Sequence, residues 1–130
     1  KAVTMTQAGG GLFSLDGLDV AELWRAGEPL NDFYQVSLTG NQFGGGVLSM
    51  LIELDGVADG PGGANDFQTI ALGGWTNLMS VTITGVNAVG GFGDYSIDNL
   101  LVNVVPEPGT YALMLAGLGL VGFMARRRIS

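Results

Sequence analysis

Apolar and polar residues alternate in several short runs along the first hundred residues, as they do in β-strands with one buried face. In one such run Tyr34, Val36 and Leu38 fall on one side, and the polar residues between them fall on the other. Gly, Asn and Asp separate the runs, and helical periodicity is scarce. The strands predicted in this way are residues 34–39, 47–54, 66–72 and 79–84. The pattern predicts an all-β, antiparallel fold, and we expect a jelly-roll-like β-sandwich.

In the run from residue 95 to residue 104, the apolar residues switch from one face of the predicted strand to the other halfway along. Tyr95 and Ile97 have one parity, and the other parity holds Leu100, Val102 and Val104. A strand of uniform register would bury only one of the two sets. We therefore predict a β-bulge or bend at Asp98 and Asn99, which would shift the register by one residue and bring both sets to the core face.

Two hexads of the sequence match each other in residue class. Residues 13–18 repeat the classes of residues 95–100 at every position, from an aromatic residue to a leucine. A single pair is not a repeat family, and coincidence in a β-rich sequence is an alternative. The hypothesis that follows is that these first and last strands lie side by side.

At residue 105 the alternating runs give way to one continuous apolar stretch. A break precedes the stretch, because two prolines that can neither extend a strand nor sit inside a helix flank a glutamate: Pro106, Glu107 and Pro108. Three basic residues follow the stretch: Arg126, Arg127 and Arg128. The stretch itself holds no charged residue and consists of Tyr111, Ala112, Leu113, Met114, Leu115, Ala116, Gly117, Leu118, Gly119, Leu120, Val121, Gly122, Phe123, Met124 and Ala125.

Such a stretch predicts a single C-terminal transmembrane helix. As a helix, residues 110–125 would be ~24 Å long at ~1.5 Å per residue, a little less than the ~30 Å hydrocarbon core of a bilayer. Thinning of the bilayer and snorkelling of the arginine side chains can make up this difference. The alternative is a buried core helix, but such a helix is amphipathic and this one is apolar on all sides. Because arginine clusters stay in the cytoplasm, we expect the preceding residues on the opposite side of the membrane.

The three parts of this segment resemble a known signal. A Pro-Glu-Pro motif, an apolar stretch and an arginine cluster occur in this order in residues 106–130, as in the PEP-CTERM sorting signal. The resemblance implies recognition by an exosortase-type membrane protease in the inner membrane of a Gram-negative bacterium. It also implies that the body is released or transferred to the cell surface or extracellular matrix, in association with exopolysaccharide and biofilm formation.

The body is similar, more loosely, to the β-sandwich modules usual in that family, whose last strand commonly carries a pattern like that of residues 95–100. By comparison with such modules, we expect that opening strands are missing from this sequence. The chain begins with Lys1, and no basic start followed by an apolar core and a cleavage site precedes the first strand. We expect either that a leader has been removed or that the sequence is a fragment.

Charge and composition exclude several classes of function. Residues 1–105 hold eleven acidic and two basic residues, a net charge of −9, so the body repels nucleic acid. The absence of Cys and His excludes disulfides, thiolate zinc sites and nucleophiles that depend on an imidazole base. Residues 117–122 satisfy G-x-G-x-x-G, but they lie within the apolar stretch and do not indicate a dinucleotide site.

Carboxylates in the body suggest two kinds of site, each with a plainer alternative. Asp55, Asp59 and Asp66 lie in a long irregular loop whose oxygens could bind Ca²⁺, but their spacing fits no EF-hand, and a solvated acidic loop is favoured. Asp16 and Asp98 could serve as the two carboxyls of a glycosidase, although no pattern indicates that they converge.

Aromatic residues in the body suggest a third kind of site, because rings of Trp24, Trp75 and Tyr95 could stack on sugars. Packing in the core is the favoured alternative. Trp75, which lies in a Gly-Gly-Trp-Thr-Asn turn, is the best candidate for an exposed ring.

Together these observations predict two parts, a β-sandwich domain in residues 1–105 and a sorting signal with a transmembrane helix in residues 106–130. The expected function is that of a non-catalytic, exported surface or matrix protein that an exosortase sorts. No cofactor is expected apart from Ca²⁺ at the acidic loop. The alternatives from other classes are a carbohydrate-binding module and a polysaccharide-acting hydrolase.

Overall fold

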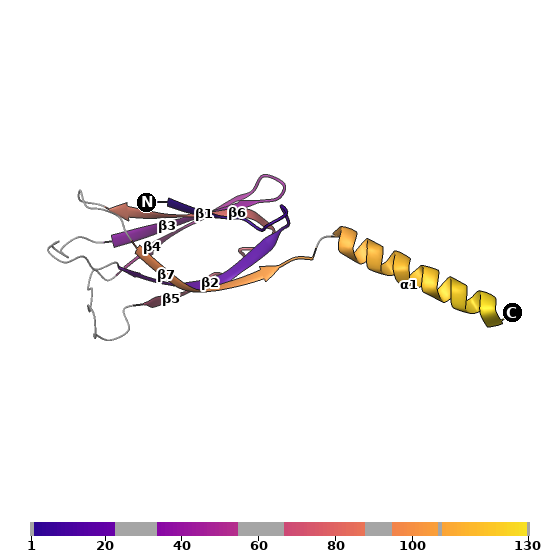
Figure 1. Ribbon diagram of the computed structural model, residues 1–130. Coiled ribbons are helices and arrows are strands. Elements are labelled where there is room, and N and C mark those ends of the chain that lie inside the picture. The colour runs from indigo at the N-terminus through magenta and orange to yellow at the C-terminus, as the bar shows by residue number, and fades with distance from the viewer. Residues whose placement is uncertain (1, 23–33, 55–66, 88–94, 107, 130) are drawn as a thin grey trace.

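The structure is a computed structural model that describes residues 2–22, 34–54, 67–87, 95–106 and 108–129 (Figure 1). The elements in these ranges are β1 (Ala2–Met5), β2 (Phe13–Glu22), β3 (Tyr34–Gln42), β4 (Val47–Glu53), β5 (Gln68–Ala71), β6 (Leu78–Asn87), β7 (Tyr95–Val104) and α1 (Pro108–Ile129). The all-β fold followed by one C-terminal helix is therefore confirmed for the described part of the chain. The strand β1 was not predicted.

The strands form two antiparallel groups that face each other (Figure 1). One group has the order β4-β3-β6-β1, and the other has the order β5-β2-β7. Strand pairing joins the two groups at Phe13 and Leu78, so all the strands belong to one continuous hydrogen-bonded sheet. The predicted sandwich is thus supported in part, and its jelly-roll connectivity stays a prediction.

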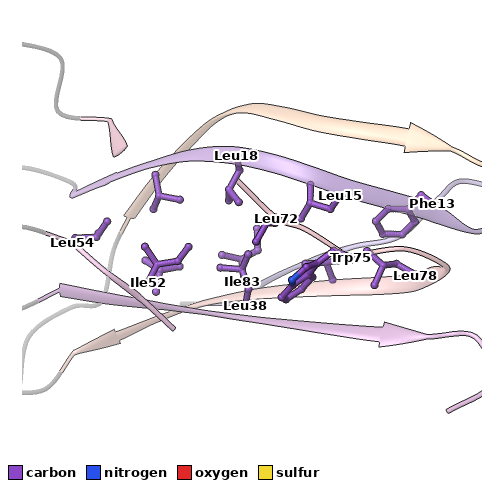
Figure 2. Packing of buried hydrophobic residues seen from close by; sticks show 13 residues of the cluster. Phe13, Leu15, Leu18, Leu38, Ile52, Leu54, Leu72, Trp75, Leu78 and Ile83 are labelled. Carbon is purple, nitrogen blue, oxygen red and sulfur yellow. The ribbon is translucent and has the colours of Figure 1, made fainter. Parts of the chain in front are cut away.

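The hydrophobic core lies between the two groups (Figure 2). Val36 and Leu38 of β3 are buried, as the alternation in that run predicts, and Ile52 of β4 joins them from the neighbouring strand. The full set of core residues is Phe13, Leu15, Leu18, Val20, Val36, Leu38, Ile52, Leu54, Leu72, Trp75, Leu78, Val81 and Ile83.

The two segments with matching hexads lie side by side. β2 and β7 pair antiparallel, from Phe13 opposite Val104 to Glu22 opposite Tyr95. This pairing confirms the hypothesis that the similarity suggested.

The predicted bulge in β7 is present. Asp98 lies opposite Asp19, and Leu101 lies opposite Gly17, so β7 fits one more residue into this interval than β2 does. Asn99, in the interval, has a φ of 47°, the left-handed conformation that asparagine tolerates better than most residues.

The bulge does not bury the second half of β7, and this part of the prediction is wrong. Tyr95 and Ile97 pack against the core. Val102 and Val104 turn to the side of Phe13, but they remain 38% and 54% exposed. The reason is that β7 lies at the edge of its group in the described part of the chain, where the opposite group gives it little cover.

A second shift of register lies in β2, between Leu15 and Gly17. Phe13 and Leu15 precede it, Leu18 and Val20 follow it, and all four are buried although the two pairs differ in parity. The shift in β2 therefore has the effect that we expected of the bulge in β7.

Gly17 lies in β2 at a position where the neighbouring strand β5 leaves no room for a side chain. A Cβ at Gly17 would lie 2.9 Å from the backbone oxygen of Ile70, which cannot rotate away. We expect Gly17→Ala to push β5 from β2 and to lower the free energy of unfolding by about 1–3 kcal/mol, as measured by chemical denaturation of the full chain. Gly73→Ala is the control, because a Cβ there meets no atom within 4 Å. Equal destabilisation by both substitutions would contradict the prediction.

Candidate functional site

The junction between β7 and α1 depends on one backbone hydrogen bond and two prolines. The amide of Val105 donates to the carbonyl oxygen of Leu12 at 3.0 Å, which ties the end of β7 to the body. Pro106 has no N–H and cannot extend this pairing. Pro108 is the first residue of α1, where a missing N–H leaves no helical hydrogen bond unmade. Glu107, the third residue of the predicted motif, lies outside the described residues.

The helix α1 is longer than the sequence predicted. Its 22 residues, Pro108–Ile129, extend ~33 Å, because the helix includes Pro108 and continues through the arginines. The segment Gly109–Ile129 has the length and composition of a membrane span, and none of its most apolar window is buried. Figure 1 shows α1 projecting away from the strands. The alternative of a buried core helix is therefore wrong for this structure.

The predicted basic cluster forms the last turn of α1. Arg126, Arg127 and Arg128 lie there, where positive charge is favourable at the negative end of the helix dipole. The guanidinium carbon of Arg127 lies 5.8 Å from the centre of the Phe123 ring one turn earlier, a cation–π arrangement. A helix that is apolar up to Ala125 and strongly basic after it has the pattern that fixes orientation in a membrane.

The glycine pattern of residues 117–122 lies inside α1. A dinucleotide site needs these glycines in a turn between a strand and a helix. The interpretation of the pattern as a coincidence is therefore consistent with the structure. A Cβ at Gly117, Gly119 or Gly122 would meet no atom within 4 Å, so α1 is open at each of these three positions.

The ring of Trp75 is not on the surface, and the expectation of an exposed glycan contact there is wrong. Trp75 is 5% exposed and lies among the core side chains in Figure 2. A Cβ on Gly40 would meet the Trp75 ring at 3.0 Å and Leu78 at 2.9 Å. The carbonyl oxygen of Trp75 accepts a hydrogen bond from the amide of Leu15 at 3.0 Å. The turn, with Gly74 at a φ of 81°, thus folds the indole back into the open end of the core.

The ring of Tyr95 is half-buried against the core. Its hydroxyl donates to the carbonyl oxygen of Ile83 at 2.7 Å and so links β7 to β6 across the interior. Burial raises the pKa of Tyr95 above its usual value. Tyr95 therefore has the structural role that was the alternative to sugar stacking.

The aspartates of β2 and β7 accept hydrogen bonds from asparagines of β7. The side-chain amide of Asn103 donates to Asp16, and that of Asn99 donates to Asp19 at 2.7 Å. The bond from Asn99 lowers the pKa of the exposed Asp19 carboxyl. Asp98 accepts from the backbone amide of Asn99 at 2.8 Å. Asp16 and Asp98 thus have different partners, and their bonds serve the pairing and the bulge of β2 and β7.

Several predicted residues lie outside the described part of the chain. They are Trp24 and the three carboxylates of the acidic loop, Asp55, Asp59 and Asp66. Among the described residues, no three metal-binding side chains come together. The Ca²⁺ hypothesis concerns the acidic loop and stays a prediction.

Comparison with known proteins bears on the junction and α1. A family model described as the PEP-CTERM protein-sorting motif matches residues 104–128. The match begins at the last residue of β7 and ends at the third arginine, so it covers the junction, the apolar helix and the basic turn. The searches of curated proteins and of solved structures find no significant match. Residues 104–128 of this chain therefore carry a segment that matches the PEP-CTERM protein-sorting motif.

Proposed function

We propose that this chain is an exported surface protein that α1 holds in a membrane until an exosortase cleaves the sorting signal. The observation that carries the proposal is the match of the PEP-CTERM motif to residues 104–128, which contain the proline junction, an apolar helix without intramolecular cover and a basic last turn. A helix with this exposed apolar surface is stable in a bilayer and costly in water.

The direction of the chain across the membrane follows from its charges. Arg126, Arg127 and Arg128 stay in the cytoplasm, and the body, with its net charge of −9, lies on the other side. In this proposal the membrane is the inner membrane of a Gram-negative bacterium, and the body faces the periplasm before it is released. Its destination is the cell surface or the extracellular matrix, where it is associated with exopolysaccharide and biofilm.

The body serves, in this proposal, as a folded unit without a catalytic role and without a bound cofactor. Its lack of Cys and His removes the commonest nucleophile and base pairs. The burial of Trp75 removes the ring that was the best candidate for a sugar contact. These two observations favour a structural role over the alternatives.

The mass and the cell fraction of the protein test the proposal. In cells with the exosortase we expect a shorter, released form that lacks Arg126, Arg127 and Arg128. In cells without the enzyme we expect the full-length chain in the membrane. A full-length, membrane-bound form in both would leave α1 as a plain anchor and contradict the sorting function.

The basic turn provides a matched pair of variants for the same experiment. Replacement of all three arginines by serine removes the charge that orients α1, so the released form should fall at least several-fold. Replacement by lysine keeps the charge and should preserve orientation. Equal release from the serine and lysine variants would show that the charge is not part of the signal.

A further inference from the structure

The tether between the body and α1 is short. Residues 105–107 are all that separates Val104, at the end of β7, from Pro108, at the start of α1. An extended chain advances at most ~3.6 Å per residue, so these two residues lie within ~14 Å of each other. The hydrogen bond from Val105 to Leu12 shortens the free part of the tether further. When α1 spans a bilayer, this end of the body is therefore held close to the lipid surface.

Several connections of the body gather at this end (Figure 1). The pairing places Phe13 opposite both Leu78 and Val104, and it places Gln42 opposite Leu78 as well. The connections that start or end at these positions lie together next to α1. We call them the helix-proximal end of the body, which comprises residues 6–12, 43–46, 72–77 and 105–106.

The helix-proximal end contains no charged residue. Glu22 and Glu53 lie toward the opposite end of the strands, where Glu22 pairs with Tyr95 and Glu53 pairs with Gln35. Eight of the eleven acidic residues of the body lie at those strand ends or in the sequence between them: Glu22, Glu28, Asp32, Glu53, Asp55, Asp59, Asp66 and Asp94. Anionic lipids repel carboxylates, so the charge distribution favours the uncharged end as the one that faces the membrane.

The helix-proximal end also exposes apolar side chains. Phe43, in the β3–β4 hairpin, is 71% exposed, and Val105 is 43% exposed. An apolar pocket of about 260 Å³ lies at the same end of the body, and its lining includes Met5, Phe13 and Val104. Apolar surface of this kind is stabilised at the boundary of headgroups and acyl chains, where interfacial proteins place Phe and Leu.

From the short tether, the missing charge and the exposed apolar groups we infer that the helix-proximal end rests on the lipid surface, with Phe43 inserted among the headgroups. The contact lasts as long as α1 is attached, and cleavage of the signal ends it. This inference rests on the proposed function in one respect, the insertion of α1 in a bilayer. It adds a second membrane contact, made by the β-body.

Spin labels on single cysteines test the inference, and the chain is suited to them because it has no Cys. We choose Phe43→Cys at the helix-proximal end, Val86→Cys near the opposite end of β6, and Leu118→Cys in α1. The full chain is reconstituted in vesicles of phosphatidylcholine and phosphatidylglycerol. Collisions of each label with dissolved oxygen and with a water-soluble nickel chelate are then measured by electron paramagnetic resonance.

We expect the label at residue 43 to collide with the nickel chelate several-fold less often than the label at residue 86. In the protein alone Phe43 is the more exposed of the two, at 71% against 37%. Without lipid contact, the label at residue 43 would therefore collide with the nickel chelate more often than the label at residue 86. Nickel collisions at residue 43 as frequent as at residue 86 would overturn the inference.

The other outcomes distinguish the two proposals. A label at residue 118 that collides freely with nickel would refute the insertion of α1, and the proposed function would fail with it. A lipid-buried label at residue 118 together with a water-exposed label at residue 43 would refute only the surface contact. Protection at residue 43 that is accompanied by spin–spin broadening, and that disappears on dilution with unlabelled chain, would assign the contact to a second copy and overturn the lipid assignment.

Discussion

Leu118→Arg should remove the chain from the membrane fraction. Leu118 lies near the middle of α1 and is 66% exposed, so no other part of the protein would shield a charge there. An arginine at the centre of a membrane helix costs ~2.5–3.5 kcal/mol, and the favourable contribution of leucine is lost as well. Because ~1.4 kcal/mol is a factor of ten, insertion should fall by ~100-fold or more. Flotation of membranes followed by detection of the full-length chain measures the change.

Two controls separate insertion from folding. Leu118→Ile preserves the apolar character of α1 and should leave the membrane fraction unchanged. Leu51→Arg adds the same charge at a 53% exposed position of β4, and it should also leave that fraction unchanged. A Leu118→Arg chain that remains in the membrane as fully as the original would mean that α1 is not the anchor, and the proposed function would lose its physical basis.

The nature of the tail could be predicted from the sequence because its signal is local and composite. Fifteen consecutive residues without charge, residues 111–125, need no knowledge of the fold to be recognised as a span. The ends of the helix were less predictable, because Pro108 and Arg126 are compatible with both helix and coil. The structure places both in α1, since proline suits the first turn and arginine suits the last.

Apart from β1, the strands could also be predicted from local alternation, but the faces of two of them could not. Burial of both Leu15 and Leu18 depends on a shift of register against β7, eighty or more residues later in the chain. The same holds for Val102, whose side was predicted correctly and whose exposure was not. The register of a strand and its burial depend on the neighbouring strands, and alternation within one strand does not predict them.

The turn around Trp75 shows the same limit for the candidate site. Glycine and asparagine on both sides of the indole predict a turn correctly, and Gly74 and Asn77 have positive φ angles there. Turns usually lie on the surface, which led to the expectation of an exposed ring. The deciding factor was Gly40 on β3, whose missing side chain leaves the space that the ring fills.

Trp75→Ala should destabilise the body rather than abolish a glycan contact. The indole is 5% exposed and packs against Gly40, so its removal leaves a cavity at the end of the core. Truncation of a buried Trp to Ala costs about 3–5 kcal/mol, a large share of the ~5–15 kcal/mol that stabilises an ordinary domain. We expect the melting temperature of the full chain to fall by more than ~10 °C, measured by near-ultraviolet circular dichroism in detergent.

Phe43→Ala is the matched control, because it removes another aromatic ring from the same end of the body but from a 71% exposed position. It should change the free energy of unfolding by no more than ~0.5 kcal/mol. Trp75→Phe keeps most of the packing and should fall between the two alanine variants. If Trp75→Ala instead left the melting temperature unchanged and abolished retention on a polysaccharide, the ring would have to act at the surface. The carbohydrate-binding alternative would then regain its strongest candidate, and the structural role proposed for the body would have to give way to it.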